Sequence, residues 1–227
     1  MRIVVSIGGS VLAPDRSAER VGAHADVIDG LVSEGHGVAV VVGGGSVARR
    51  YIETARQLGA TEYDLDAVGI DATRLNARLL ATALDAPADT DPVESHEAAR
   101  AAVRRGETAV MGGTVPGHTT DAVSALLAET LSADLLVYAT SVDGVYSTDP
   151  DEDDAAVRHD HLTPGELVDV IASIETAAGS QAPVDLLAAK VIERSGLRAV
   201  VLDGTDPSRV TDAVAGDVDG TDVVPDD

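Results

Sequence analysis

The chain has 227 residues, and its 39 acidic and 16 basic residues give a formal net charge of −23. This length is enough to bury a sizeable core, and we expect one α/β domain. The charge argues against binding to nucleic acid or to an anionic membrane surface, because both require a cationic face on the protein.

The composition indicates a protein adapted to high salt. Lys190 is the only lysine, the other basic side chains are arginines, and Phe, Trp and Cys are absent. A surface this acidic repels itself in dilute buffer, and salt screens that repulsion over a few ångströms. The lack of cysteine excludes disulfides, thiolate metal sites and thiol nucleophiles.

We expect a soluble cytoplasmic protein without a membrane partner. The first apolar run, residues 2–7, is too short for a signal peptide. No apolar stretch approaches the length that spans a bilayer.

Apolar runs rich in Val and Ile alternate with segments of helical periodicity. The runs predict strands at residues 2–7, 38–42, 108–111, 135–139, 199–202 and 222–224. Helices are predicted at residues 17–33, 47–58, 72–84, 95–105 and 184–195, and further helices start near residues 121, 164 and 207. Continuously apolar strands between helices indicate a mainly parallel sheet that is covered on both faces.

Between the periodic segments, polar residues give weaker signals. Thr163 and Glu166 flank a proline at the first helical position, which is the pattern of a capping box. Asp66 is expected in an irregular stretch between two helical segments. His159 and His161 are interpreted as solvated residues of an acidic surface loop. The six histidines show no metal-binding pattern, and we predict no metal ligands among the side chains.

Residues 110–129, VMGGTVPGHTTDAVSALLAE, contain the clearest ligand-binding pattern of the chain. An apolar strand ends at Gly112 and Gly113, and a helix follows from Asp121. Glycines let the backbone approach a ligand closely, and the free N–H groups of a helix start attract anions. Side-chain donors in the same loop come from Thr114, His118, Thr119 and Thr120. Taken alone, the pattern is also that of a βα turn that binds nothing.

Four of the predicted strands end in glycine or small polar turns, at Gly8, Gly43, Gly112 and Thr140. Ligands of open α/β sheets collect at the carboxyl ends of the strands. Four such turns at one edge of a sheet therefore predict a large anion-binding cleft.

Two common nucleotide-binding patterns are considered and set aside. Gly43, Gly45 and Ala48 match GxGxxA after a strand, and Asp64 or Asp66 follows about twenty residues later. In a dinucleotide-binding fold that acidic residue follows the next strand, whereas Asp66 is expected between helical segments. The chain also contains no GxxxxGK[ST] sequence, which excludes a P-loop.

The turns belong to a longer set of segments that resembles the amino acid kinase superfamily. The segments are GGS at 8–10, VVVGGGSVARRYI at 40–52, the loop at 110–129, ATSVDGVYSTDP at 139–150 and VDLLAAKVIERSG at 184–196. Within the superfamily, the chain is most similar to the archaeal-type uridylate kinases. The match spans nearly the whole chain in the same order.

The resemblance implies a three-layer αβα sandwich that transfers the γ-phosphoryl group of ATP to UMP, with Mg²⁺. It implies one domain over residues 1–227, whose part at roughly 1–130 binds UMP and whose part at roughly 131–227 binds ATP. It also implies assembly into a homohexamer.

The family motifs assign binding residues by position. UMP would be held by Gly44, Asp66, Thr114, Val115, Pro116, Gly117, His118, Thr119 and Thr120, with Asp66 on the ribose hydroxyls. ATP would be held by Gly9, Ser10, Gly45, Arg49, Thr140, Tyr146 and Asp149. Carboxylates bind sugar hydroxyls well, and glycine turns and arginine suit phosphate. Without the resemblance, the plain alternatives are a solvated Arg49, a core Tyr146 and a turn residue at Asp149.

Catalysis of phosphoryl transfer mainly requires two aligned anions and cations that neutralise the growing charge. We predict that Lys190, the one lysine retained, contacts the transferred group, where a compact ammonium fits well. Asp121 matches the family position that orients the catalytic lysines. The plain alternatives are an exposed helix residue for Lys190 and an ordinary N-cap for Asp121.

The chain departs from the superfamily pattern at two positions. Ser6 stands where many members have a lysine, which leaves open which cation contacts the β or γ phosphate. Ser141 stands where asparagine is common. Two other functions therefore stay open: a sibling kinase of isopentenyl phosphate, carbamate or an amino acid, and a non-catalytic nucleotide-binding protein.

Overall fold

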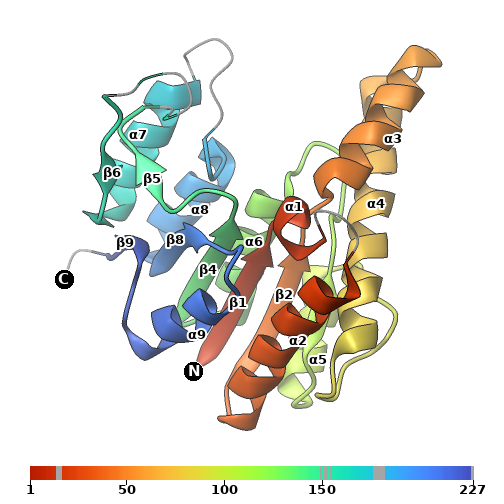
Figure 1. Ribbon diagram of the computed structural model, residues 1–227, viewed down its shortest axis with the longest axis horizontal. Coiled ribbons are helices and arrows are strands. Elements are labelled where there is room, and N and C mark those ends of the chain that lie inside the picture. The colour runs from red at the N-terminus through yellow and green to blue at the C-terminus, as the bar shows by residue number, and fades with distance from the viewer. Residues whose placement is uncertain (14–16, 149, 151–152, 154, 176–181, 226–227) are drawn as a thin grey trace.

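The computed structural model describes residues 1–13, 17–148, 150, 153, 155–175 and 182–225. Its central sheet contains β1 (Arg2–Ile7), β2 (Gly37–Val42), β3 (Ala109–Met111), β4 (Leu135–Thr140), β7 (His161–Leu162), β8 (Ala199–Asp203) and β9 (Gly220–Val223). These seven strands lie in the order β3-β2-β1-β4-β8-β9-β7 (Figure 1). A separate short pair consists of β5 (Val145–Tyr146) and β6 (Arg158–His159), which are antiparallel.

Helices cover both faces of the sheet, which confirms the predicted αβα sandwich. They are α1 (Gly9–Leu12), α2 (Ala18–Ser33), α3 (Gly45–Gln57), α4 (Glu62–Ala83), α5 (His96–Arg104), α6 (Thr120–Leu131), α7 (Pro164–Glu175), α8 (Leu186–Ser195) and α9 (Ser208–Ala215). Alternate strand residues enter two separate cores: Ile3 and Val5 pack with α2, α4 and α9, while Val4 packs with α5, α6, α7 and α8.

The parallel register brings the predicted turns to one edge of the sheet. β1 pairs in parallel with both β2 and β4, and β2 pairs in parallel with β3. The turns at Gly8, Gly43, Gly112 and Thr140 therefore follow the carboxyl ends of four adjacent strands, as predicted. The chain moves outward from β1 to β2 and β3 and then returns to β4 on the other side of β1. The strand order therefore reverses at β1, between β2 and β4. In open α/β sheets, a ligand crevice forms at the point where the strand order reverses.

The prediction of an irregular stretch around Asp66 is wrong, because Asp66 lies inside the helix α4. The helix starts at Glu62, ten residues earlier than predicted, after a capping box in which Thr61 and Asp64 each bind the backbone N–H of the other. Gly69 lies inside the helix, where a Cβ would come 3.2 Å from Ile52 of α3. The glycine thus lets α3 and α4 pack closely, as Figure 1 shows.

Two smaller expectations are also corrected. His159 is not solvated: it lies in β6, and its Nε2 atom is buried with no hydrogen-bond partner among the described residues. The helix predicted from residue 184 starts at Leu186, with Asp185 as its N-cap. The capping box of Thr163 and Glu166 is confirmed. In the described part of the chain, no helix is long and apolar enough to cross a membrane.

The core on the α6 side supplies the first testable prediction. Leu127 of α6 is fully buried in the core that the sheet forms with α5, α6, α7 and α8. Leu127→Ala should lower the free energy of unfolding by about 2–5 kcal/mol, because it removes apolar contacts and leaves a cavity. Urea denaturation in molar KCl measures the change. Leu187→Ala, at a side chain that is 43% exposed, is the control, and equal losses in both variants would contradict this packing.

Candidate active site

Two glycine turns contact each other, backbone against backbone, at the carboxyl ends of β1 and β2. A Cβ on Gly43 would lie 2.8 Å from the N atom of Gly9, and one on Gly45 would lie 2.7 Å from the carbonyl O of Gly9. Gly45 also has a φ of +58°, which favours glycine. Because main-chain atoms cannot move aside as a side-chain tip can, this contact leaves no room for any larger residue.

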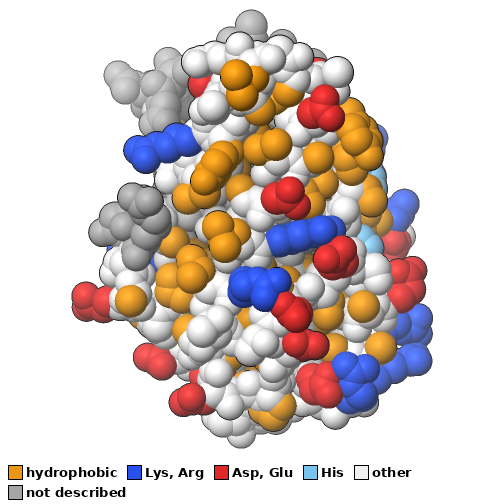
Figure 2. Space-filling view, turned by 90° about the vertical axis from the view of Figure 1, so that its right-hand side faces the viewer, with side chains coloured by type: hydrophobic (Ala, Val, Ile, Leu, Met, Phe, Trp, Pro, Cys, Tyr) orange, Lys and Arg blue, Asp and Glu red, His pale blue; other side chains and the backbone are white. Residues whose placement is uncertain are grey.

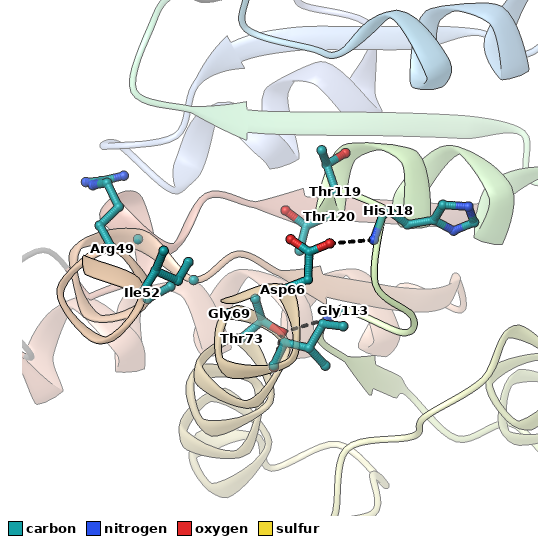
Figure 3. Close-up of a pocket in the computed structure, with 14 residues that line it drawn as sticks. Arg49, Ile52, Asp66, Gly69, Thr73, Gly113, His118, Thr119 and Thr120 are labelled. Atoms are coloured by element: carbon teal, nitrogen blue, oxygen red, sulfur yellow. Dashed lines mark hydrogen bonds between the residues drawn. The ribbon is translucent and has the colours of Figure 1, made fainter. Parts of the chain in front are cut away.

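The third turn joins β3 to α6 and contains the predicted phosphate loop. The N–H of Gly113 donates to Oγ1 of Thr73 at 2.7 Å, and the N–H of Gly117 donates to Oδ2 of Asp66 at 2.7 Å (Figure 3). Thr119 is the N-cap of α6, with its Oγ1 accepting from the N–H of Ala122. The loop is therefore held on one side by α4 and on the other by the helix that it starts.

A cavity of about 380 Å³ lies between these turns and α4. This volume is within the range of small-ligand sites. Eight predicted nucleotide-binding residues line it: Gly44, Gly45, Arg49, Asp66, Gly117, His118, Thr119 and Thr120. Six lining residues were not predicted: Ala48, Ile52, Gly69, Ile70, Thr73 and Gly113. Figure 3 shows the Asp66 carboxylate facing the loop, whereas the His118 ring points away from Asp66.

The other predicted UMP residues, Thr114, Val115 and Pro116, belong to the same loop but do not line this cavity. Of the predicted ATP residues, Gly45 and Arg49 line the cavity. Gly9 and Ser10 start α1, and Oγ of Ser10 accepts a hydrogen bond from Arg49 at 3.1 Å. Asp149 lies outside the described residues.

Thr140 and Tyr146 lie in the chain segment that follows β4. The hydroxyl of Thr140 donates to the carbonyl of Val142 and accepts from its N–H, which closes the turn. The Tyr146 hydroxyl donates to Asp143 at 2.8 Å, and this bond raises the pKa of Tyr146. Arg158 holds the same Asp143 carboxylate at 3.1 Å. Sequence reasoning missed Asp143 and Arg158, which brace the segment predicted to hold ATP.

Two carboxylates meet at the N-termini of α6 and α8. Burial, with the carboxylate of Asp185 as the second cause, raises the pKa of Asp121 to about 7. Asp185 accepts from the N–H of Ala188 at 2.8 Å and from the hydroxyl of Thr119. Asp121 is not the N-cap of α6, since Thr119 takes that position. Asp185 was not singled out from the sequence, although a polar residue just before a helix is a capping signal.

Lys190 is exposed on α8. Residues 188, 189, 191 and 192 are buried. Because successive residues of an α-helix are rotated by about 100°, Lys190 lies on the opposite face of the helix. Lys190 does not line the cavity. The structure therefore does not bring the only lysine to the predicted phosphate site, and its catalytic role stays a prediction.

Within the described ranges, no group of three or more His, Asp or Glu side chains is placed to hold a metal ion. The Asp121 and Asp185 pair offers oxygen ligands of the kind that Mg²⁺ prefers. Mg²⁺ is commonly held by one or two carboxylates together with substrate phosphates. A pair of carboxylates beside the predicted phosphate loop fits that mode of binding.

Residues 1–203 match the amino acid kinase family. The chain belongs to this family. It is 72% identical to a uridylate kinase of Natronomonas pharaonis, over 99% of both chains. It is 63% identical to a uridylate kinase of Halobacterium salinarum, over all of this chain and 94% of the relative. These relatives come from halophilic archaea, in agreement with the acidic composition.

A solved structure supports the same assignment. The crystal structure of the uridylate kinase from Archaeoglobus fulgidus is 45% identical to this chain and superposes with a TM-score of 0.88. The alignment covers 99% of this chain and all of the other. The seven-stranded sheet and its covering helices are thus the amino acid kinase fold.

The carboxylate pair predicts a pH dependence of stability. The folded chain keeps a proton on Asp121 up to about pH 7, whereas the unfolded chain releases it near the ordinary value of 3.8. The free energy of unfolding should therefore fall as the pH rises through this window. Asp121→Asn cannot release such a proton and should gain stability relative to the wild type between pH 4 and pH 8.

Urea denaturation of the ligand-free protein in molar KCl at several pH values measures this difference. Asp26→Asn, which changes an exposed carboxylate of α2, is the matched control. Parallel pH curves for the wild type and Asp121→Asn would contradict the placement of a half-buried Asp121 beside Asp185.

Proposed function

We propose that this chain transfers the γ-phosphoryl group of ATP to UMP, giving ADP and UDP. The observation that carries the proposal is the cavity between the glycine turns and α4, which is lined both by the Asp66 carboxylate and by backbone of the glycine turns. Its close relatives are named uridylate kinases along their full length. A cytoplasmic location and a place in pyrimidine nucleotide biosynthesis are part of this proposal.

The two ends of the cavity suit the two ends of a nucleoside monophosphate. One carboxylate oxygen of Asp66 accepts from the N–H of Gly117, and the other has no hydrogen-bond partner among the described residues, so it can accept from ribose hydroxyls. The turn at Gly44 and the start of α6 offer backbone N–H groups to the phosphate. A carboxylate repels phosphate, so this arrangement orients the nucleotide in the cavity.

On the ATP side, Gly45 and Arg49 face the same cavity and Ser10 lies beside Arg49. In the reaction, a UMP phosphate oxygen bonds to the γ-phosphorus as the bond to the β–γ bridging oxygen breaks, and ADP leaves. The protein needs no covalent nucleophile, because alignment and charge neutralisation supply most of the catalysis. Contrary to the prediction of no metal ligands among the side chains, we propose that Asp121 and Asp185 hold Mg²⁺ when ATP is bound, where the ion would neutralise phosphate charge.

Arg49 is the side-chain cation that lines the described cavity. Its guanidinium donates a hydrogen bond to Ser10, which is one of the residues predicted to bind ATP. We therefore propose that Arg49, with Mg²⁺, stabilises the charge on the transferred group. This assignment fills the gap left by Ser6, which stands where many family members have a lysine.

A turnover assay with Mg-ATP in molar KCl tests the function directly. UMP should be converted to UDP, while CMP, isopentenyl phosphate and carbamate should be left unchanged. Faster turnover of another acceptor would assign a sibling activity. Binding of ATP and UMP without turnover of any acceptor would support the non-catalytic alternative and contradict the proposal.

Arg49→Gln should lower kcat by about 100-fold, because removing a transition-state cation typically costs several kcal/mol. Lys190→Ala, measured in parallel, separates the two candidate cations. A loss of turnover confined to Lys190→Ala, with ATP still bound, would return the catalytic role to Lys190 and overturn the assignment to Arg49.

We also propose that copies of the chain associate through α3 and α4. Figure 2 shows hydrophobic side chains gathered on the side of the molecule that carries these helices. Tyr51 and Leu75 are 61% and 53% exposed there. They border a groove of about 300 Å³ whose lining is Val47, Tyr51, Val68, Asp71, Ala72 and Leu75. Large apolar side chains exposed together mark an interaction surface. The hexameric number follows the family resemblance.

Tyr51→Glu should shift the assembly toward smaller species, since it places a charge in the apolar groove. Sedimentation velocity in molar KCl measures the distribution of species. Leu187→Glu, at an exposed apolar residue of α8, is the control. An unchanged distribution for Tyr51→Glu would exclude this face as the interface.

A further inference from the structure

We propose that Thr73 and Asn76 of α4 are positioning residues, which set the orientation of the backbone in the two turns that receive phosphate. Both side chains are almost fully buried, with exposed fractions of 6% and 3%. They lie three residues apart on one face of α4 and contact different turns. The inference rests on the proposed function only where it names the ligand as a nucleotide phosphate.

Asn76 binds the turn after β2. Its amide Nδ2 donates to the carbonyl of Gly43 at 2.9 Å and to the carbonyl of Gly44 at 3.2 Å. In a planar trans peptide the C=O and N–H groups point in opposite directions. Since both carbonyls face Asn76, the N–H groups of Gly44 and Gly45 point away from the Asn76 amide.

These two N–H groups are the ones available to a ligand. Gly44 and Gly45 both line the cavity, and neither N–H has a hydrogen-bond acceptor in the part of the chain that the structure describes. Successive free N–H groups of this kind form an anion-binding concavity. Asn76 thus fixes the orientation of the two peptide groups and leaves their N–H groups available to a ligand.

Thr73 fixes the turn after β3. Its hydroxyl accepts from the N–H of Gly113 at 2.7 Å and donates to the carbonyl of Ile70 at 2.6 Å, so it acts as both donor and acceptor. A Cβ on Gly112 would lie 2.5 Å from the same hydroxyl, so the turn rests directly on Thr73. The carbonyl of Gly113 accepts from Nε of Arg74 at 3.3 Å, which by the same planarity directs the N–H of Thr114 away from the Arg74 side chain.

Helix packing alone does not require these two polar residues. The neighbouring buried positions on α4 are Ala72, Ala77, Leu80 and Ala81, which pack without hydrogen bonds from their side chains. A buried hydroxyl or amide is unfavourable unless it is hydrogen-bonded. Both Thr73 and Asn76 use their polar atoms on glycine turns that line or border the cavity.

The test compares Thr73→Val, which keeps the shape and removes the hydroxyl, with Thr73→Ser, which keeps the hydroxyl. Affinities for UMP and uridine are measured by titration calorimetry in molar KCl. Thr73→Val should weaken UMP binding about tenfold or more, because a buried N–H loses its acceptor and the turn shifts. Thr73→Ser should restore most of the affinity for UMP, and uridine binding should stay unchanged in both variants.

Thr82→Val is the matched control on the same helix. Its hydroxyl donates to the carbonyl of Arg78 at 2.8 Å, on an exposed part of α4. UMP affinity of Thr73→Val equal to that of Thr82→Val would overturn the inference. A parallel loss of UMP and uridine binding would also overturn it, since it would indicate a collapsed cavity rather than a misdirected phosphate turn.

Asn76→Asp provides a second, nearly isosteric variant if Thr73→Val does not fold. It replaces the donor by a carboxylate facing two carbonyls, and it should weaken binding of both UMP and ATP. If the wild type binds no UMP, the proposed function fails. The positioning inference is then tested with inorganic phosphate on the same variants, where equal binding by the wild type and Asn76→Asp would contradict it.

Discussion

The close contact between two glycine turns is the constraint on which the rest of the site depends. The turn after β1 and the turn after β2 meet through main-chain atoms, so Gly9, Gly43 and Gly45 leave no space for a Cβ. The parallel register of β1 with β2 and β4 brings the turns to the same height. Sheet geometry thus sets where the backbone donors lie, and the side chains of neighbouring helices set which way the donors point.

This construction explains how a chain with a net charge of −23 can bind phosphate groups. The cavity contains Arg49 as its side-chain cation, and its other anion-binding groups are backbone N–H groups and hydroxyls. Backbone dipoles keep their orientation at any ionic strength, whereas attraction between exposed charges is screened by salt. A phosphate site built mainly on glycine turns therefore suits a protein adapted to high salt.

Sequence reasoning predicted the elements whose signal is local. Glycines at the ends of apolar runs located three of the turns, and the capping box at Thr163 located a helix. Asp66 was misplaced because Gly69 interrupts the helical pattern and because Asp64, rather than Glu or Gln, completes its capping box. Thr73 and Asn76 act through contacts distant in sequence, so no local pattern marks them. Asp185 carries a helix-capping signal, but that signal does not indicate its contact with Thr119. Lys190 was singled out because it is the only lysine. The helical spacing of the apolar residues on either side of it already places its side chain on the solvent face.

The central claim is that both nucleotides meet in one cleft at the carboxyl edge of the sheet. A bisubstrate analogue, with adenosine and uridine joined through a chain of phosphates, tests it most directly in a cocrystal structure. The account predicts one analogue per chain, with phosphates on the N–H groups of Gly44 and Gly45 and with the uridine ribose on Asp66. An analogue bound at another edge of the sheet, or with its phosphates away from these turns, would contradict the account.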